Sequence, residues 1–254
     1  MDSLITFLLI YAATYFGFVT LYLGGGLFIT AINNRYPERR IQKTRKNTRT
    51  KQEILQSLSS LLVTAGCLAF GLFSQHQGWT ITPLPLTIWS AVGMFVVSVI
   101  LFDAWFYFAH RFVHLKPFYK IHHLHHTAVA PTVWSNYYDT WLDAFAMQSY
   151  FLWIVFVLPI PPEVLIAHRL FDHFNGMFGH CGFEHFAGKS ARWPSIGVCT
   201  VFHDQHHAHF NTNFANHFSY LDRLFGTIDP RYDEAVKAFE TDPAHANVKG
   251  AIKD

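Results

Sequence analysis

Long apolar runs dominate the first half of the chain. Three of them, residues 4–32, 54–73 and 86–109, are long enough to cross a membrane, because a helix needs about 20 apolar residues to span the hydrocarbon core. A shorter run at 144–160 ends in a proline-rich stretch, and the more polar segment 164–180 follows it. We predict a helical hairpin here, with 141–158 running out, 164–180 running back and the prolines at its tip.

The distribution of charge predicts the orientation of these helices. Residues 35–51 contain eight basic residues and a single acid, Glu38, and short basic loops of this kind stay in the cytoplasm. Residues 74–85 contain no Lys, Arg, Asp or Glu and are predicted to lie on the opposite side. We therefore expect an all-α integral membrane protein with about four transmembrane helices in two hairpins. The first run is expected to stay as a membrane anchor, and the polar region from Cys181 is expected to form a cytosolic helical cap.

Composition supports a membrane protein built as one domain. Hydrophobic residues make up 51% of the chain and charged residues 14%, against about 25% charged residues in soluble domains. We predict a single domain over 1–254, with N-terminal membrane helices at 1–100, a catalytic region at 101–230 and a tail at 231–254. The net charge is only +2 and the basic residues gather in one loop, so no nucleic-acid partner is expected. The three cysteines show no C-x-x-C pairing and predict neither a disulfide framework nor a thiolate metal site.

Nine histidines follow a pattern typical of metal ligands. An H-x-x-x-H pair is followed by two H-x-x-H-H clusters, with one isolated histidine between the clusters. These residues are His110 and His114; His122, His125 and His126; His180; and His203, His206 and His207. Because each cluster covers an arc of about 100° on a helix, we expect all its imidazoles to converge on one point. Nine imidazoles are too many for one ion, so the pattern predicts a two-metal site.

Several other residues are candidates for supporting this site. Either Glu184 or His173 could complete a coordination sphere. Carboxylates and hydroxyls that orient metal-bound imidazoles are also expected, and the candidates are Asp103, Tyr107, Asp204 and Asp222. The alternatives for the last two are a solvated or capping role for Asp204 and a pair with Arg223 for Asp222. The remaining histidines considered are expected to be structural, namely His76, His123, His168, His209, His217 and His245.

Ligand type alone does not choose the metal, because imidazole binds zinc, copper and iron. The clusters adjoin a helix rich in aromatic residues, which favours an apolar substrate that arrives from the bilayer. Oxidation of an unactivated C–H bond requires a redox metal such as iron. The alternative is zinc acting as a Lewis acid on a lipid ester or aldehyde. A metal transporter or a dihaem cytochrome is disfavoured, because the ligands gather at one membrane face.

Residues 101–227 resemble the fatty acid hydroxylase/sterol desaturase superfamily of membrane di-iron oxidases. The matching motifs are FDAWFYFAHRFVH, FYKIHHLHH, GHCGFE, FHDQHH and NHFSYLDRLFGT. The resemblance implies that the nine histidines bind two iron ions, that O2 is the co-substrate and that a lipid is hydroxylated or desaturated. It also implies a site on the cytoplasmic side of the bacterial inner membrane or the endoplasmic reticulum. Zinc could occupy the site in a purified form.

Two features of the sequence narrow the electron donor and the lipid substrate that the resemblance implies. The chain contains no His-Pro-Gly-Gly haem motif, so electrons are expected from a separate donor of the cytochrome b5 or ferredoxin type. The segment HCGFE at 180–184 is closer to the sterol-modifying branch, which favours a sterol-like or long-chain lipid.

Overall fold

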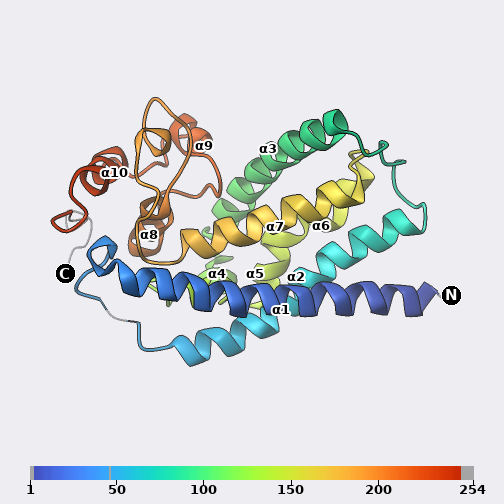
Figure 1. Ribbon diagram of the computed structural model, residues 1–254, viewed down its shortest axis with the longest axis horizontal. Helices are drawn as coiled ribbons and strands as arrows, with labels where there is room; N and C mark the ends of the chain where they lie inside the picture. Colours follow the sequence, from blue (N-terminus) through green and yellow to red (C-terminus); the bar gives the residue numbers. More distant parts are fainter. Residues whose placement is uncertain (1–2, 46, 247–254) are drawn as a thin grey trace.

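The computed structural model describes residues 3–45 and 47–246, and their regular structure is helical. Within these residues the β contacts are two isolated bridges, Arg40 to Phe183 and Gly197 to Phe218. Figure 1 shows long helices running side by side, with the C-terminal helices gathered at the end away from the N-terminus. The prediction of an all-α fold is confirmed.

Three helices are long and apolar enough to cross a membrane: α1 (Ser3–Arg35), α2 (Thr50–His76) and α3 (Ile88–Val113). α1 and α2 contain the first two apolar runs predicted from the sequence, and α3 contains the third from Ile88 onward. α1 packs along α2, with the short helix η1 (Pro37–Arg39) at its end. α3 begins at a capping box, in which Thr87 and Ser90 each accept the other's backbone N–H, and this satisfies two donors at the helix start.

The predicted outgoing helix of the hairpin is broken. It consists of α5 (Trp141–Gln148), α6 (Tyr150–Trp153) and the 3-10 turn η3 (Ile154–Phe156). The break occurs where the chain packs against α2: a Cβ on Gly71 would lie 2.3 Å from the Phe151 carbonyl oxygen. Only glycine permits this approach, so tertiary packing overrides the continuous helix expected from the apolar run.

The return helix is α7 (Pro162–Gly179), which begins with proline in its first turn and packs against α3 and α8. The tip of the hairpin contacts the connection between α2 and α3. Leu84 N donates to Pro159 O at 2.9 Å, and Gln75 Nε2 donates to Ile160 O at 2.8 Å. The tip thus lies beside the uncharged loop, although the number of spans remains a prediction.

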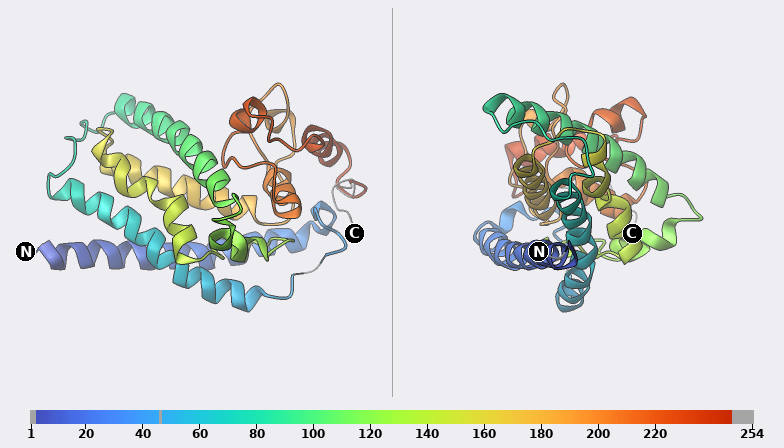
Figure 2. Two further views of the ribbon diagram at one scale, coloured as in Figure 1. Left: turned by 180° about the vertical axis from the view of Figure 1, so that it is seen from behind. Right: turned by 90° about the vertical axis from the view of Figure 1, so that its right-hand side faces the viewer.

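The region after α7, which we call the cap, packs around a buried cluster that also includes Ile41 and Tyr107. It comprises η4 (Lys189–Ala191), α8 (Thr200–His209), α9 (Tyr220–Leu224) and α10 (Tyr232–Thr241). Figure 2 shows these helices at one end of the long helices, with α4 (Tyr119–His126) nearby. α10 packs on α8, so the described part of the predicted tail belongs to the cap; 247–254 lie outside the described residues. The turn η2 (Val133–Ser135) links α4 to the hairpin.

Candidate metal centre

The nine patterned histidines meet where α3, α4, α7 and α8 end, in two groups. His110, His114, His122, His126 and His206 form the five-nitrogen group, and His125, His180, His203 and His207 form the four-nitrogen group. Within each group, one nitrogen from every ring lies within 4.8 Å of the others. Ligands held about 2.1 Å from one ion are separated by about 3.0–4.2 Å, so each group is only slightly wider than a single-ion site.

Each H-x-x-H-H cluster is divided between the two groups, which corrects the expectation that a cluster converges on one point. On α4, His122 and His126 join the five-nitrogen group and His125 the four-nitrogen group. On α8, His203 and His207 join the four-nitrogen group, whereas His206 joins the other. Positions i and i+4 point about 40° apart on a helix, while i+3 points about 60° to the other side of i. α4 and α8 therefore lie between the two groups and supply both.

Hydrogen bonds fix the tautomers of several of these rings. His110 Nδ1 donates to Phe214 O at 2.8 Å, and His122 Nδ1 lies 2.7 Å from Asp143 Oδ2. With the proton on Nδ1, each Nε2 presents a lone pair, and these two Nε2 atoms face each other at 3.1 Å. Two lone pairs repel unless a cation lies between them.

The four-nitrogen group repeats this arrangement. His180 Nδ1 donates to Gly176 O at 2.8 Å, and His125 Nδ1 lies 2.8 Å from Asp139 Oδ1. The free Nε2 atoms of the two rings face each other at 3.2 Å. The donor geometry of both groups thus fits a bound metal ion in each.

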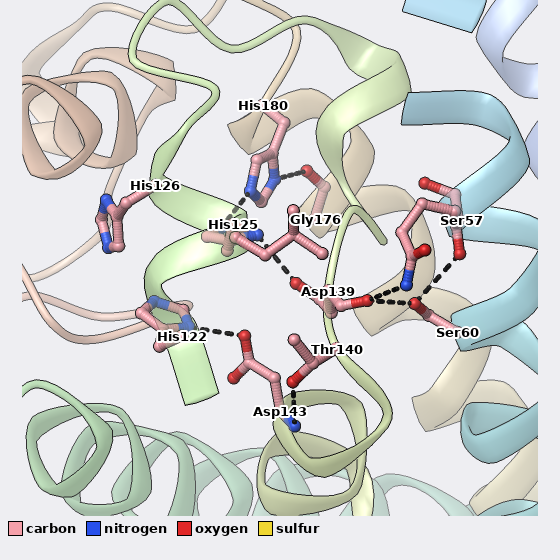
Figure 3. A network of polar contacts seen from close by, with 12 residues as sticks. Ser57, Ser60, His122, His125, His126, Asp139, Thr140, Asp143, Gly176 and His180 are labelled. Atoms are coloured by element: carbon pink, nitrogen blue, oxygen red, sulfur yellow. Dashed lines mark hydrogen bonds and ion pairs between the residues drawn. The ribbon is translucent and has the colours of Figure 1, made fainter. Parts of the chain in front are cut away.

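Asp139 and Asp143 were missed by the sequence analysis. Figure 3 shows them beneath α4, one on His125 and one on His122. Asp139 is held in turn through its backbone carbonyl, which accepts from Gln56 Nε2 and from Ser60 Oγ. The sequence contained one signal for a functional role of these residues: they are two carboxylates four residues apart at the start of an apolar run. A charge there is costly unless it has a function.

The carboxylates predicted to orient histidines contact backbone instead. Asp103 Oδ1 accepts the N–H of His217 at 2.7 Å, and Asp222 accepts those of Phe214 and Ala215. Both hold the loop whose Phe214 carbonyl accepts from His110, so they act on the ligand through the backbone. Asp222 does not pair with Arg223, which binds Asp233.

The other two candidates also lie outside direct contact with the ligand atoms. Tyr107 bonds Thr227 Oγ1 at 3.0 Å, and Asp204 accepts from Gln42 Nε2 at 2.9 Å. Burial raises the pKa of Asp204 to about 7, opposed by the hydrogen bond from Gln42. Through its hydrogen bond with Gln42, Asp204 connects the loop after α1 to α8, the helix that carries three ligand histidines.

Glu184 and His173, the residues considered for completing a coordination sphere, are not in either group. The Glu184 carboxylate accepts backbone N–H groups from Phe186 and Val201. His173 Nδ1 lies 2.8 Å from the Tyr137 hydroxyl, inside the helix bundle. The histidines expected to be structural are also outside both groups; His209, for example, pairs with Asp229.

Burial favours the neutral form of the ligand histidines on α8. Burial lowers the pKa of His206 well below its usual range, and the neighbouring His110 lowers it further. Burial and then His125 have the same effect on the pKa of His207. Neutral imidazole is the form that coordinates metal.

A cavity of about 530 Å³ adjoins both groups, a volume typical of ligand pockets. Histidines of the two groups form part of its wall, and aromatic and aliphatic side chains form much of the rest. The histidines are His110, His122, His125, His180 and His203, and the apolar residues include Phe106, Met147, Phe171, Phe174, Phe178 and Phe202. A substrate there would reach both groups at once.

The chain is similar in sequence to several curated proteins with named enzymatic activities. It is 28% identical to human cholesterol 25-hydroxylase over 137 residues, covering 51% of this chain and 49% of that protein. It is 32% identical to chicken methylsterol monooxygenase 1 over 126 residues, covering 49% of this chain and 42% of the relative. With the rice very-long-chain aldehyde decarbonylase GL1-11 the identity is 30% over 175 residues, covering 64% and 62%. The matches span about half the length of these relatives, and no solved structure matches.

A family profile also matches the part of the chain that contains the histidines. The profile of the fatty acid hydroxylase family matches residues 95–227, more than half of the 254-residue chain. This region contains all nine histidines of the two groups, together with Asp139 and Asp143. The chain therefore belongs to the fatty acid hydroxylase family, within the fatty acid hydroxylase/sterol desaturase superfamily.

Proposed function

We propose that the protein is an O2-dependent membrane oxidase that hydroxylates or desaturates a C–H bond of a sterol-like or long-chain lipid. The observation that carries this proposal is the pairing of two all-imidazole groups with one largely apolar cavity. The five-nitrogen and four-nitrogen groups would each hold one iron ion. Bound iron would supply the redox chemistry that activates O2 for attack on the lipid.

The chain's own residues position the reactants. Asp143 accepts the Nδ1 proton of His122, which would direct the Nε2 lone pair toward its metal position and raise the basicity of the ring. Asp139 lies 2.8 Å from His125 Nδ1 and is placed to act on that ring electrostatically. The aromatic wall, including Phe106 and Phe202, would exclude water and hold the apolar part of the lipid beside the histidines. Exclusion of water protects reactive species from side reactions.

We further propose that the centre faces the cytoplasm, with electrons supplied by a separate cytochrome b5- or ferredoxin-type donor. The basic loop after α1 supports this sidedness. It meets the histidine end of the molecule directly: Ile41 N donates to Gly182 O at 3.0 Å, two residues after His180. The loop and the metal centre would therefore lie at the same membrane face.

The reaction class is tested by comparing iron-loaded and zinc-loaded protein in nanodiscs. Each preparation receives a reductant, O2 and a mixture of sterols and long-chain lipids, and products are detected by mass spectrometry. We expect hydroxylated or desaturated products only with iron, O2 and reductant together. Lipid products that form equally with zinc and without O2 must arise without oxidation. They would instead establish Lewis-acid chemistry at the same histidines.

A further inference from the structure

The end of α9 carries two large apolar side chains that the proposed reaction does not use. Leu224 is 73% exposed and Phe225 is 48% exposed, and both belong to the motif NHFSYLDRLFGT at 216–227. The preceding residues of this helix face the other way, because Leu221 and Asp222 are buried. The motif therefore has an inner face that packs in the cap and an outer face that is apolar and exposed.

The outer face of α9 joins exposed aromatic residues of α3. The Phe225 ring lies edge-on to the Phe108 ring, with 5.9 Å between the ring centroids. It also stacks on Tyr107 at 5.7 Å. Phe108 and Phe112 are 53% and 49% exposed. The resulting surface, which we call the α3–α9 patch, consists of Phe108, Phe112, Leu224 and Phe225.

The α3 part of the patch continues the face of α3 that is directed toward lipid. The exposed residues on this face are Val97, Leu101, Phe108 and Phe112. At 100° per residue, these four positions fall within an arc of about 60°. α3 is long and apolar enough to span a membrane, and Phe108 belongs to the apolar run that predicts the span. Because Phe225 lies against Phe108, lipid that covers this face of α3 would also reach the cap.

A cation lies at the edge of the patch. The guanidinium carbon of Arg111 lies 5.9 Å from the centroid of the Phe225 ring, and Arg111 Nη1 donates to the Tyr107 hydroxyl at 3.1 Å. Arginine near the end of a membrane helix extends its charge toward the headgroups. Segments that lie in the membrane interface combine such cations with Trp, Phe and Leu. The chemistry of the patch, together with its continuity with α3, favours a lipid surface as its partner.

The patch is connected to the metal centre through two hydrogen bonds. Asp222, two residues before Leu224, accepts the backbone N–H of Phe214 at 2.9 Å. The Phe214 carbonyl in turn accepts from His110 Nδ1 at 2.8 Å. Anchoring the end of α9 would therefore hold the backbone that orients a candidate metal ligand.

We propose that the α3–α9 patch is embedded in the membrane leaflet at the histidine end of the molecule, so that Leu224 and Phe225 anchor the cap in the bilayer. The partner of this surface is the acyl-chain region of the membrane lipids just below their headgroups. Interfacial segments of this kind are buried about 5–10 Å into that boundary. The inference goes beyond the proposed oxidation and does not depend on which reaction the metals support.

The proposal is tested by depth-dependent fluorescence quenching in full-length, metal-loaded protein, with one chain in each nanodisc. Leu224→Cys carries a nitrobenzoxadiazole label; its side chain is largely exposed and the native cysteines are buried. Lipids brominated near the headgroup should remove most of the fluorescence of this label. Lipids brominated at the end of the acyl chain should remove less, and aqueous iodide should have little effect.

Two further labelled positions provide the controls. Leu101→Cys lies on the same face of α3, about 10 Å further into the span than Phe108, and should be quenched by chain-end bromine at least as strongly as by headgroup bromine. Lys237→Cys lies on exposed α10 surface and should be quenched by iodide alone.

Two results would overturn the proposal. A Leu224 label that responds like the Lys237 label would show that the end of α9 lies in water. Quenching by lipid that is lost when two chains share one nanodisc would instead assign the patch to contact with a second copy of the chain. Because no oxidation is measured, either result is distinct from failure of the proposed reaction.

Discussion

At the residue scale, the ability of the centre to bind metal depends on which nitrogen of each imidazole carries the proton. Asp143 sets this for His122, and backbone carbonyls do so for His110, His180 and His206. Asp139 lies close to His125 Nδ1. Two residues that are not candidate ligands therefore lie directly against the rings of candidate ligands. Of the side chains that the sequence favoured for this role, Asp103 and Asp222 accept backbone N–H groups near Phe214. Tyr107 and Asp204 bond to other side chains.

Removal of either carboxylate should weaken one metal position more than the other. Asp143→Ala should lower the metal affinity of the five-nitrogen group, and Asp139→Ala that of the four-nitrogen group, each by about 10- to 100-fold. Metal titration of the purified variants measures this. Asp242→Ala is the control, because Asp242 is exposed at the end of α10. Equal affinity in all three variants would contradict the role assigned to these carboxylates.

Two histidines on α8 allow a predicted metal ligand to be compared with a nearby histidine that is not predicted to bind metal. His207 belongs to the four-nitrogen group, whereas His209 pairs with Asp229 at 2.7 Å. We expect His207→Ala to lose one metal per chain and His209→Ala to retain both, as counted by inductively coupled plasma mass spectrometry. Full metal content in His207→Ala would refute the ligand assignment at that position.

At the element scale, short helices divide the histidines and close packing bends the hairpin. α4 has eight residues and α8 has ten, and each serves both metal groups. α6 approaches α2 at Gly71 so closely that a Cβ would overlap the Phe151 carbonyl. The arrangement of helices around the centre is therefore sensitive to the volume of single side chains far from the histidines.

Filling the contact at Gly71 should loosen the bundle. Gly71→Ala is expected to lower the free energy of unfolding by about 1–3 kcal/mol, because overpacking forces backbone shifts. Thermal unfolding in detergent measures the loss. Gly93→Ala is the matched control in α3, where a Cβ would meet nothing within 4 Å, and it should not destabilise the protein. Equal melting temperatures for the two variants would contradict the close approach of α6.

At the scale of the whole molecule, the sequence predicted the helical class, the three long apolar helices and the set of histidines that come together. Hydrophobic run length and histidine spacing are local properties, so they can be read directly. The division of the nine histidines into groups of five and four could not be read this way, because it depends on where α4 and α8 lie relative to α3 and α7. The roles of Asp139 and Asp143 depend on the same packing, as does the cavity.

Contacts between loops predict which segments lie on the same side of the membrane. The hairpin tip bonds to the α2–α3 connection, while the basic loop bonds to the segment after α7. Cysteines introduced at Ile81 and Val157 should therefore react with a membrane-impermeant maleimide from one side, and those at Thr48 and Lys189 from the other. The native cysteines are buried and should contribute little labelling. Reaction of Val157→Cys from the same side as Thr48→Cys would show that the hairpin does not cross.

The most direct test of the central claim is the metal content of full-length protein expressed with iron, together with its Mössbauer spectrum. Two iron ions per chain, in two distinguishable nitrogen-rich environments, are the result predicted by the five-nitrogen and four-nitrogen groups. One ion per chain, or two zinc ions that iron cannot replace, would contradict the account of a two-iron oxidase.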